Sequence, residues 1–169
     1  MVRLNTLDPR APTLSPSAVR VAGIQFLASD QPGLGVAGTL TKDIILPAYS
    51  LLIDVYVHNA VLWTQGTSAA LDVGLFDEDG VAIDADYYFS ALNLKATDLL
   101  ADESVSFGFA GGDNGVGLAT STHVLKRFST APRILRSVVT TAGTASLVGK
   151  TFVFAEYAVC ELDSPTYAA

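Results

Sequence analysis

Residues 50–58 read SLLIDVYVH, and this stretch decides the fold class because its apolar residues recur with a period of two. Such alternation is typical of a half-buried β-strand. The predicted inner face carries Leu51, Ile53, Val55 and Val57, and the outer face carries Asp54, Tyr56 and His58. Residues 69–76, AALDVGLF, show the same pattern, with Ala69, Leu71, Val73 and Leu75 inward. The intervening TQGTS (64–68) predicts a hairpin that pairs the two strands.

Further short segments are rich in β-branched and aromatic residues and are separated by turn formers. They are VRVAGIQFL (19–27), SVSFGFA (104–110), HVLKRFS (123–129), RILRSVVTT (133–141) and TFVFAEYAVCEL (151–162). The last is apolar on both faces and is predicted to be central. The one helical candidate is ADYYFSAL (85–92) with LKATDLL (94–100). The sequence therefore predicts an all-β fold, a single antiparallel β-sandwich of jelly-roll-like type, with at most one short helix.

The domain is predicted to span residues 19–169, after an extended N-terminal arm over residues 1–18. Proline at positions 9, 12 and 16 disfavours a helix in this arm. The arm is locally basic, since Arg3, Arg10 and Arg20 face only one acid, Asp8, within the first twenty residues. The glycine-rich stretch GFAGGDNGVGLATS (108–121) predicts a long loop that serves as a contact element. The expected partner-binding residues are Arg3, Arg10, Gly111, Gly112 and Asn114.

The composition indicates a subunit of an assembly. Half of the residues are hydrophobic and 16% are charged, against about 25% charged in typical domains. A surface short of charge exposes apolar patches, which mark protein contacts. The net charge of −7 argues against a nucleic-acid partner. No membrane partner is expected, because the apolar run IILPAYSLLI stops at Asp54, and the N-terminus lacks the apolar core of a secretory signal.

No sequence motif for catalysis or nucleotide binding has the spacing that its chemistry requires. GTASLVGKT (143–151) resembles a phosphate-binding loop, but Thr144 stands where the pattern requires glycine. We interpret it as a hairpin loop before a strand. His58 and His123 show no metal-ligand spacing, and the lone Cys160 lies in an apolar pattern typical of a buried thiol. We therefore expect no enzymatic activity and no catalytic residues.

The acidic stretch LDVGLFDEDG (71–80) leaves two interpretations open. It does not fit an EF-hand, because the sixth and twelfth positions counted from Asp77 are Ala82 and Tyr88. One interpretation is a polar Asp-Gly turn that ends a strand. The other is a calcium site, because clustered carboxylates attract a divalent cation. The candidate ligands are Asp77, Asp79, Asp84 and Asp86, and no other cofactor is expected.

Aromatic residues also leave an alternative open. An exposed platform could bind sugars, and the candidates are Tyr56, Trp63, Tyr87 and Tyr88. Against this, Trp63 follows an apolar run, and a lone tryptophan usually packs its large apolar area into the core. A carbohydrate-binding β-sandwich module is therefore an alternative function from a different class.

The stretch from Ile45 to Leu92 resembles small virion proteins of tailed bacteriophages, of the head decoration or cement type. The resemblance rests on Pro47, Gly66, Thr67, Ser68, Leu71, Val73 and Gly74. It implies a non-enzymatic jelly-roll-like protein, often a homotrimer, that binds and clamps the major capsid protein. It also implies synthesis in the host cytoplasm and a final place in the virion, on the capsid surface. A tail or fibre structural protein is the alternative within the same class.

Overall fold

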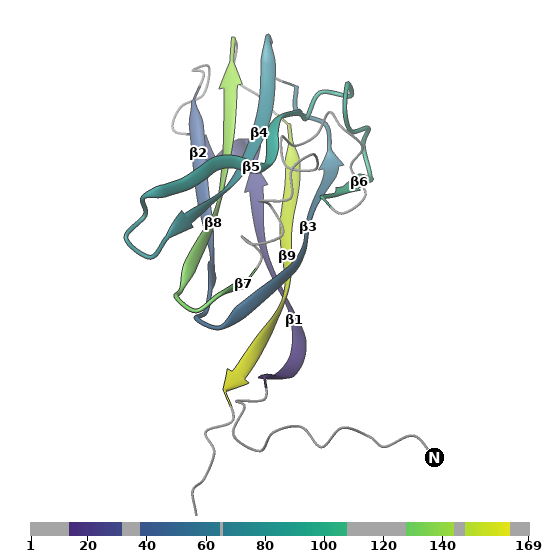
Figure 1. The fold of residues 1–169 in the computed structure, drawn as a ribbon. Helices are drawn as coiled ribbons and strands as arrows, with labels where there is room; N and C mark the ends of the chain where they lie inside the picture. The colour runs from purple at the N-terminus through teal and green to yellow at the C-terminus, as the bar shows by residue number, and fades with distance from the viewer. Residues whose placement is uncertain (1–13, 32–37, 65, 108–127, 144–147, 163–169) are drawn as a thin grey trace, which may run out of the picture.

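The computed structural model describes residues 14–31, 38–64, 66–107, 128–143 and 148–162, with no description of the side chains of 14–18, 161 and 162. These residues form two antiparallel sheets packed face to face (Figure 1). Sheet A has the order β1 (Leu14–Leu27), β9 (Lys150–Leu162), β3 (Ser50–Val61) and β6 (Glu103–Ser106), and β7 (Phe128–Ser129) also pairs with β3. Sheet B has the order β2 (Thr39–Leu46), β8 (Arg133–Ala142), β4 (Ser68–Asp77) and β5 (Ala82–Asn93).

The strands β1 to β4 alternate between the two sheets along the chain, and β8 and β9 do so again. This alternation is the arrangement of a jelly roll, and it confirms the predicted fold class. The central place of the last strand is also confirmed, because β9 lies between β1 and β3. Within the described residues the helical structure is the short 3-10 turn η1 (Ala28–Asp30). No helix among them is long and apolar enough to cross a membrane.

The core lies between the sheets. Alternate residues of β4 face inward, and Ala69, Leu71, Val73 and Leu75 are all fully buried, as predicted. Opposite them sheet A contributes apolar side chains from its three long strands. These include Phe26, Leu52, Val55, Val57 and Val153.

The prediction of which β3 side chains face the core is only partly confirmed. Val55 and Val57 are fully buried, but Leu51 is 39% exposed and Leu52 is buried in its place. The cause is a break in register against β9, where Leu52 pairs with Tyr157 but Asp54 pairs with the next residue, Glu156. A β-bulge at Ile53 therefore reverses the alternation, as an extra residue in one strand must.

Two predicted hairpins are also wrong. The strand after residues 64–68 does not pair with β3, because β4 pairs with β5 and β8 in sheet B. The connection after β8 is likewise not a hairpin, since β8 and β9 lie in different sheets. Both connections cross from one sheet to the other, which lets two apolar faces meet instead of lying side by side.

The helical candidate at residues 85–92 is a strand, β5. Residues 85–88 of β5 stand opposite the single residue Gly74 of β4, because Val73 pairs with Phe89 and Leu75 pairs with Asp84. A Cβ atom on Gly74 would collide with the Ala85 carbonyl, so glycine is required where β5 passes over β4. The bulge turns the consecutive residues Tyr87 and Tyr88 both into the core, which breaks the period-two alternation that identifies a strand.

β1 begins at Leu14, so residues 14–18 of the expected arm already pair with the end of β9. Together β1 and β9 extend below the other strands in Figure 1. Residues 1–13 lie outside the described part of the chain.

Candidate functional site

The outer face of sheet A is the best candidate for a contact surface. At its lower end, one row of paired residues crosses the sheet: Val19 pairs with Ala158, Ala158 with Leu51, and Leu51 with Phe128. Paired residues in antiparallel strands point to the same side. Val19 is 55% exposed, and Leu51 and Phe128 are 39% and 36% exposed, whereas Ala158 between them is buried. We call these four residues the apolar row.

A hydrogen-bonded polar group lies beside the apolar row. The carboxylates of Asp54 and Glu156 belong to directly paired residues of β3 and β9. Asp54 accepts hydrogen bonds from the backbone N–H of Val55, at 2.7 Å, and from the hydroxyl of Ser106. Glu156 accepts a hydrogen bond from the hydroxyl of Tyr56 at 2.7 Å. These contacts brace the strands at the β-bulge.

The same group alters the acidity of Tyr56. The hydrogen bond to Glu156 raises the pKa of the Tyr56 phenol to about 12, with smaller contributions from desolvation and from the negative charge of Asp54. A phenolate beside two carboxylates would meet repulsion and would lose the hydrogen bond that it donates. Tyr56 therefore stays protonated over the physiological range and acts as a structural donor.

Aromatic rings cover the upper part of this face. Phe152 and Phe154 stack with ring centroids 5.9 Å apart, and His58 stacks on Phe152 at 6.1 Å. The Lys150 ammonium lies 4.9 Å from the centre of the Phe152 ring. The Phe154 ring also lies over Gly23, where a Cβ atom would come within 2.6 Å of the ring. The outer face of sheet A thus carries aromatic rings in its upper part, the hydrogen-bonded group of Asp54 and Glu156 in the middle, and the apolar row at its lower end.

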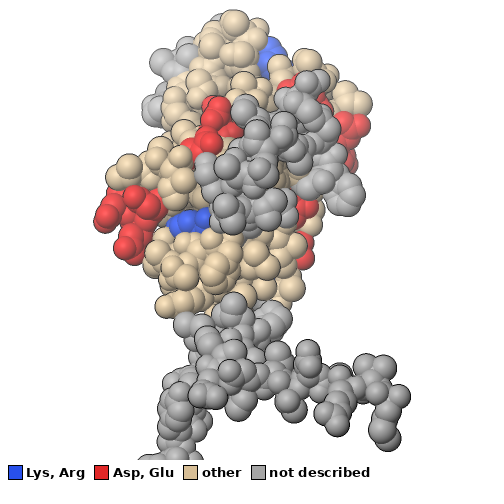
Figure 2. Space-filling view, viewed as in Figure 1, with Lys and Arg blue, Asp and Glu red and all other residues tan. Residues whose placement is uncertain are grey.

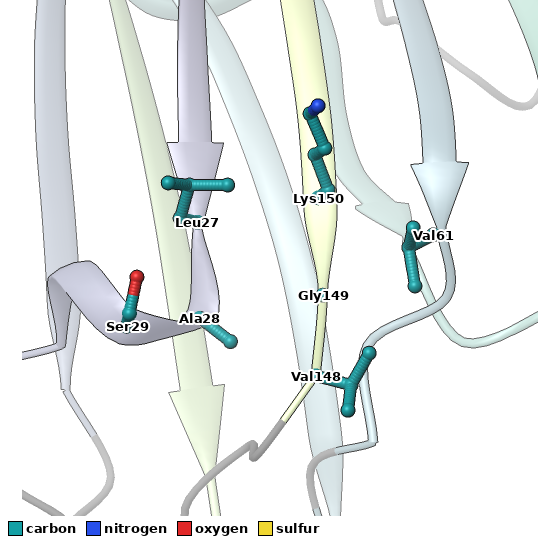
Figure 3. A pocket seen from close by; sticks show the side chains of 7 residues that line it. All are labelled: Leu27, Ala28, Ser29, Val61, Val148, Gly149 and Lys150. Atoms are coloured by element: carbon teal, nitrogen blue, oxygen red, sulfur yellow. The ribbon is translucent and has the colours of Figure 1, made fainter.

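An open hollow lies at the upper end of the same sheet (Figure 3). It measures about 240 Å³ and is formed where β1, β3 and β9 end or begin. Its apolar rim includes Val61 and Val148, which are 37% and 48% exposed. The Trp63 ring packs against Gly149 from inside, so the hollow has an apolar floor. The described residues that line it include no cluster of catalytic groups.

The acidic stretch forms the turn between β4 and β5. One carboxylate oxygen of Asp77 accepts hydrogen bonds from the backbone N–H groups of Asp79, at 3.1 Å, and Val81, at 2.8 Å. Gly80 has a φ of +80°, a conformation that glycine adopts without strain. Acidic side chains gather over this hairpin in Figure 2. These contacts are those of the polar turn.

The other calcium candidates lie further along β5. Asp86 accepts a hydrogen bond of 2.9 Å from the Ser90 hydroxyl, and Asp84 pairs with Leu75. Among the described residues no group of three His, Cys, Asp or Glu side chains is placed to hold a metal ion. The structure therefore does not bring Asp77, Asp79, Asp84 and Asp86 together as a cage.

The aromatic platform for sugars is not formed. Trp63, Tyr87 and Tyr88 are at most 2% exposed. The Trp63 indole N–H donates to the Thr151 hydroxyl at 2.8 Å, and that hydroxyl donates to the Asn59 side-chain oxygen at 2.9 Å. Trp63 is a core residue, as its apolar context predicted, and the carbohydrate alternative loses three of its four candidate residues.

Of the remaining candidate residues, His58 and Cys160 lie in the part of the chain that the structure describes. His58 lies in β3, half-buried, with Nδ1 2.9 Å from the Ser104 hydroxyl and Nε2 3.7 Å from the Asp102 carboxylate. Cys160 is a buried free thiol, as predicted. The expected partner-binding residues and His123 lie outside the described part of the chain. These partner-binding residues are Arg3, Arg10, Gly111, Gly112 and Asn114.

The apolar row was not predictable from the alternation of residues 50–58, which places Leu51 in the core, and the pattern of residues 123–129 does not single out Phe128. The available signal was Leu52, a second leucine beside Leu51 that permits either face to be buried. The described strands define a β-sandwich protein of the jelly-roll class, and exposed apolar side chains form a row on the outer face of sheet A.

No protein-family model and no curated protein matches the chain. Among solved structures, a chain of the acid-stable capsid of Helicobacter pylori bacteriophage KHP30 has the same fold. The TM-score is 0.53 and the identity 14%, over 88% of this chain and 93% of that chain. A chain of the Ralstonia phage GP4 capsid has a TM-score of 0.49 at 18% identity, over 95% of this chain and 93% of that chain. A chain of the cyanophage Pam1 capsid asymmetric unit has 0.48 at 17% identity, over 92% and 98%.

Proposed function

We propose that the protein is a non-enzymatic structural protein of a bacteriophage virion, of the decoration or cement type, that binds the lattice of the major capsid protein. The observation that carries the proposal is the apolar row, which leaves Val19, Leu51 and Phe128 exposed on the outer face of sheet A. The fold shared with a chain of a phage capsid structure supports the same class. The resemblance of residues 45–92 to decoration proteins supports the more specific role.

The proposed work is mechanical. When Leu51 and Phe128 pack against a capsid subunit, apolar area leaves water, which contributes about 25 cal/mol for each Å² buried. A protein that binds the assembled lattice and not the free subunits stabilises the assembled state by mass action. The effect would be to raise the temperature at which the capsid comes apart.

A homotrimer on the capsid surface fits this role. Copies linked to one another bind a repeating lattice through several contacts at once, and the effective concentration of the later contacts is high. The low content of charged residues, 16%, supports burial of surface against such neighbours.

Co-sedimentation with empty mature capsids tests the proposal. We expect the protein to pellet with capsids and to raise their melting temperature. Absence of both effects would contradict capsid binding. Gold labelling of the protein in intact virions then separates the head location from the tail or fibre alternative, because label on tails alone would support the alternative.

A further inference from the structure

β1 is the outermost strand of sheet A, and part of its free edge is open. The Gln25 carbonyl accepts a hydrogen bond from the Lys42 ammonium at 2.6 Å, so the backbone groups of Gln25 point away from β9. Both backbone groups of a residue point the same way in an antiparallel strand, and the direction alternates along the chain. Val19, Val21 and Gly23 therefore also point their N–H and C=O groups to the edge, where no described strand pairs with them.

This edge lacks the usual protection against pairing. Natural edge strands are commonly blocked by charged side chains, by proline or by a covering segment. Here Val19 and Val21 are 55% and 66% exposed, and Gly23 has no side chain. The one charged residue among them, Arg20, is exposed on the opposite face of the strand, so the face that carries Val19 and Val21 has no charge at this edge. Protection begins only at Gln25, where Lys42 also forms a 2.8 Å ion pair with Asp30. The open edge from Val19 to Gly23 is therefore suited to accept another strand.

The chain itself contains a segment that fits. Residues 2–7, VRLNTL, alternate so that Val2 and Leu4 share one face of an extended strand and Arg3 and Asn5 share the other. Proline at positions 9 and 12 follows and disfavours further pairing. The segment would extend about 20 Å as a strand, enough to cover the open edge.

The geometry favours a neighbouring copy over the same copy. β1 begins at Leu14, so a chain that reversed over residues 8–13 would place residue 7 beside Leu14 and Val2 beside Val19. Val21 and Gly23 would then stay open. A segment that arrives from another copy has no such limit. The positive charge of Arg3 in the segment, and of Arg10 just after it, suits contact with a chain whose net charge is −7.

We propose that residues 2–7 of one copy add as a strand to the open edge of β1 in a neighbouring copy, with Val2 and Leu4 beside Val19 and Val21. This contact deepens the proposed function, on which it rests, by naming what joins adjacent copies on the lattice. The main-chain hydrogen bonds would supply affinity, and the apolar pairs would set the register.

Disulfide trapping between two different chains tests the contact. In a Cys160→Ala background, full-length Leu4→Cys protein is mixed with full-length Val21→Cys protein under mild oxidation. We expect a cross-linked dimer of one chain of each kind. The matched control replaces Val21→Cys by Val81→Cys, at a valine of similar exposure, 63%, on the β4–β5 hairpin. Equal cross-linking in the two mixtures would overturn the proposal. So would an intrachain cross-link in a chain carrying both Leu4→Cys and Val21→Cys.

A second variant acts on the backbone alone. Val21→Pro removes an N–H group that points to the open edge and that β9 does not use, so strand addition should be lost while the fold is kept. We expect sedimentation to show loss of the wild-type oligomer. If this variant fails to fold, deletion of residues 2–13 replaces it. An unchanged oligomer would overturn the inference, whereas loss of capsid binding with cross-linking intact would contradict the proposed function alone.

Discussion

The Tyr56 hydroxyl donates a 2.7 Å hydrogen bond to the Glu156 carboxylate across β3 and β9. This bond raises the pKa of Tyr56 from an ordinary value of 10.0 to about 12 in the folded protein. A group whose pKa is raised by folding adds stability below its unfolded pKa and loses that stability as the pH rises through the folded value. The contribution of Tyr56 is therefore complete below pH 10 and is lost between pH 10 and about 12.

Tyr56→Phe is expected to lower the free energy of unfolding at pH 7 and to flatten its decline between pH 10 and 12. Urea unfolding at several pH values measures both effects. Tyr49→Phe, at a tyrosine that is 37% exposed, is the matched control. An unchanged pH dependence in Tyr56→Phe would show that the hydrogen bond to Glu156 does not set this behaviour.

A second prediction concerns the buried contact between Trp63 and Thr151. The Thr151 hydroxyl accepts from the Trp63 indole and donates to Asn59, and Thr151 is fully buried. Thr151→Val keeps the shape but leaves both partners unsatisfied, which costs about 1–3 kcal/mol for each buried polar group. We expect thermal unfolding to show a clear loss of stability. Thr140→Val, at an exposed position of β8, should change little.

The third prediction concerns a substitution that should stabilise the fold. The Ser137 hydroxyl is buried between the sheets and makes no hydrogen bond to any residue that the structure describes. Burial of an unpaired hydroxyl is unfavourable, so Ser137→Ala is expected to raise the free energy of unfolding by about 1 kcal/mol. Chemical denaturation measures the change. A marked loss of stability would reveal a partner for this hydroxyl.

A fourth prediction separates the two interpretations of the acidic turn. Asp77→Ala removes an acceptor of two backbone hydrogen bonds and should cost about 1 kcal/mol. Asp79→Ala, at an exposed residue of the same turn, should cost less. We also expect the melting temperature to be the same in calcium and in chelator. A rise in calcium that Asp77→Ala and Asp79→Ala both abolish would restore the calcium site.

The fold class was predictable because period-two alternation is a local property of the chain. Ala69 to Leu75 show this clearly, since every predicted inner residue of β4 is buried. The sheet to which each strand belongs was not predictable, because a short polar connection such as TQGTS serves a hairpin and a crossing between sheets equally well. Pairing of β4 with β8 depends on contacts distant in sequence.

Bulges explain the remaining errors. The extra residue at Ile53 exposes Leu51 and so creates the apolar row. The bulge opposite Gly74 turns Tyr87 and Tyr88 inward together, so β5 lacks the period-two alternation by which a strand is recognised. A bulge is set by the partner strand, so a single strand read alone gives no sign of it.

The most direct test of the central claim is capsid binding by a variant of the apolar row. Leu51→Lys places a charge on the outer face of sheet A, whereas Ile45→Lys places the same charge on β2 of sheet B, where Ile45 is 72% exposed. If the apolar row contacts the capsid, Leu51→Lys should lose co-sedimentation with empty capsids at least tenfold, about 1.4 kcal/mol of binding free energy. Ile45→Lys should bind as the unmodified protein does. Equal binding by both variants would contradict the account.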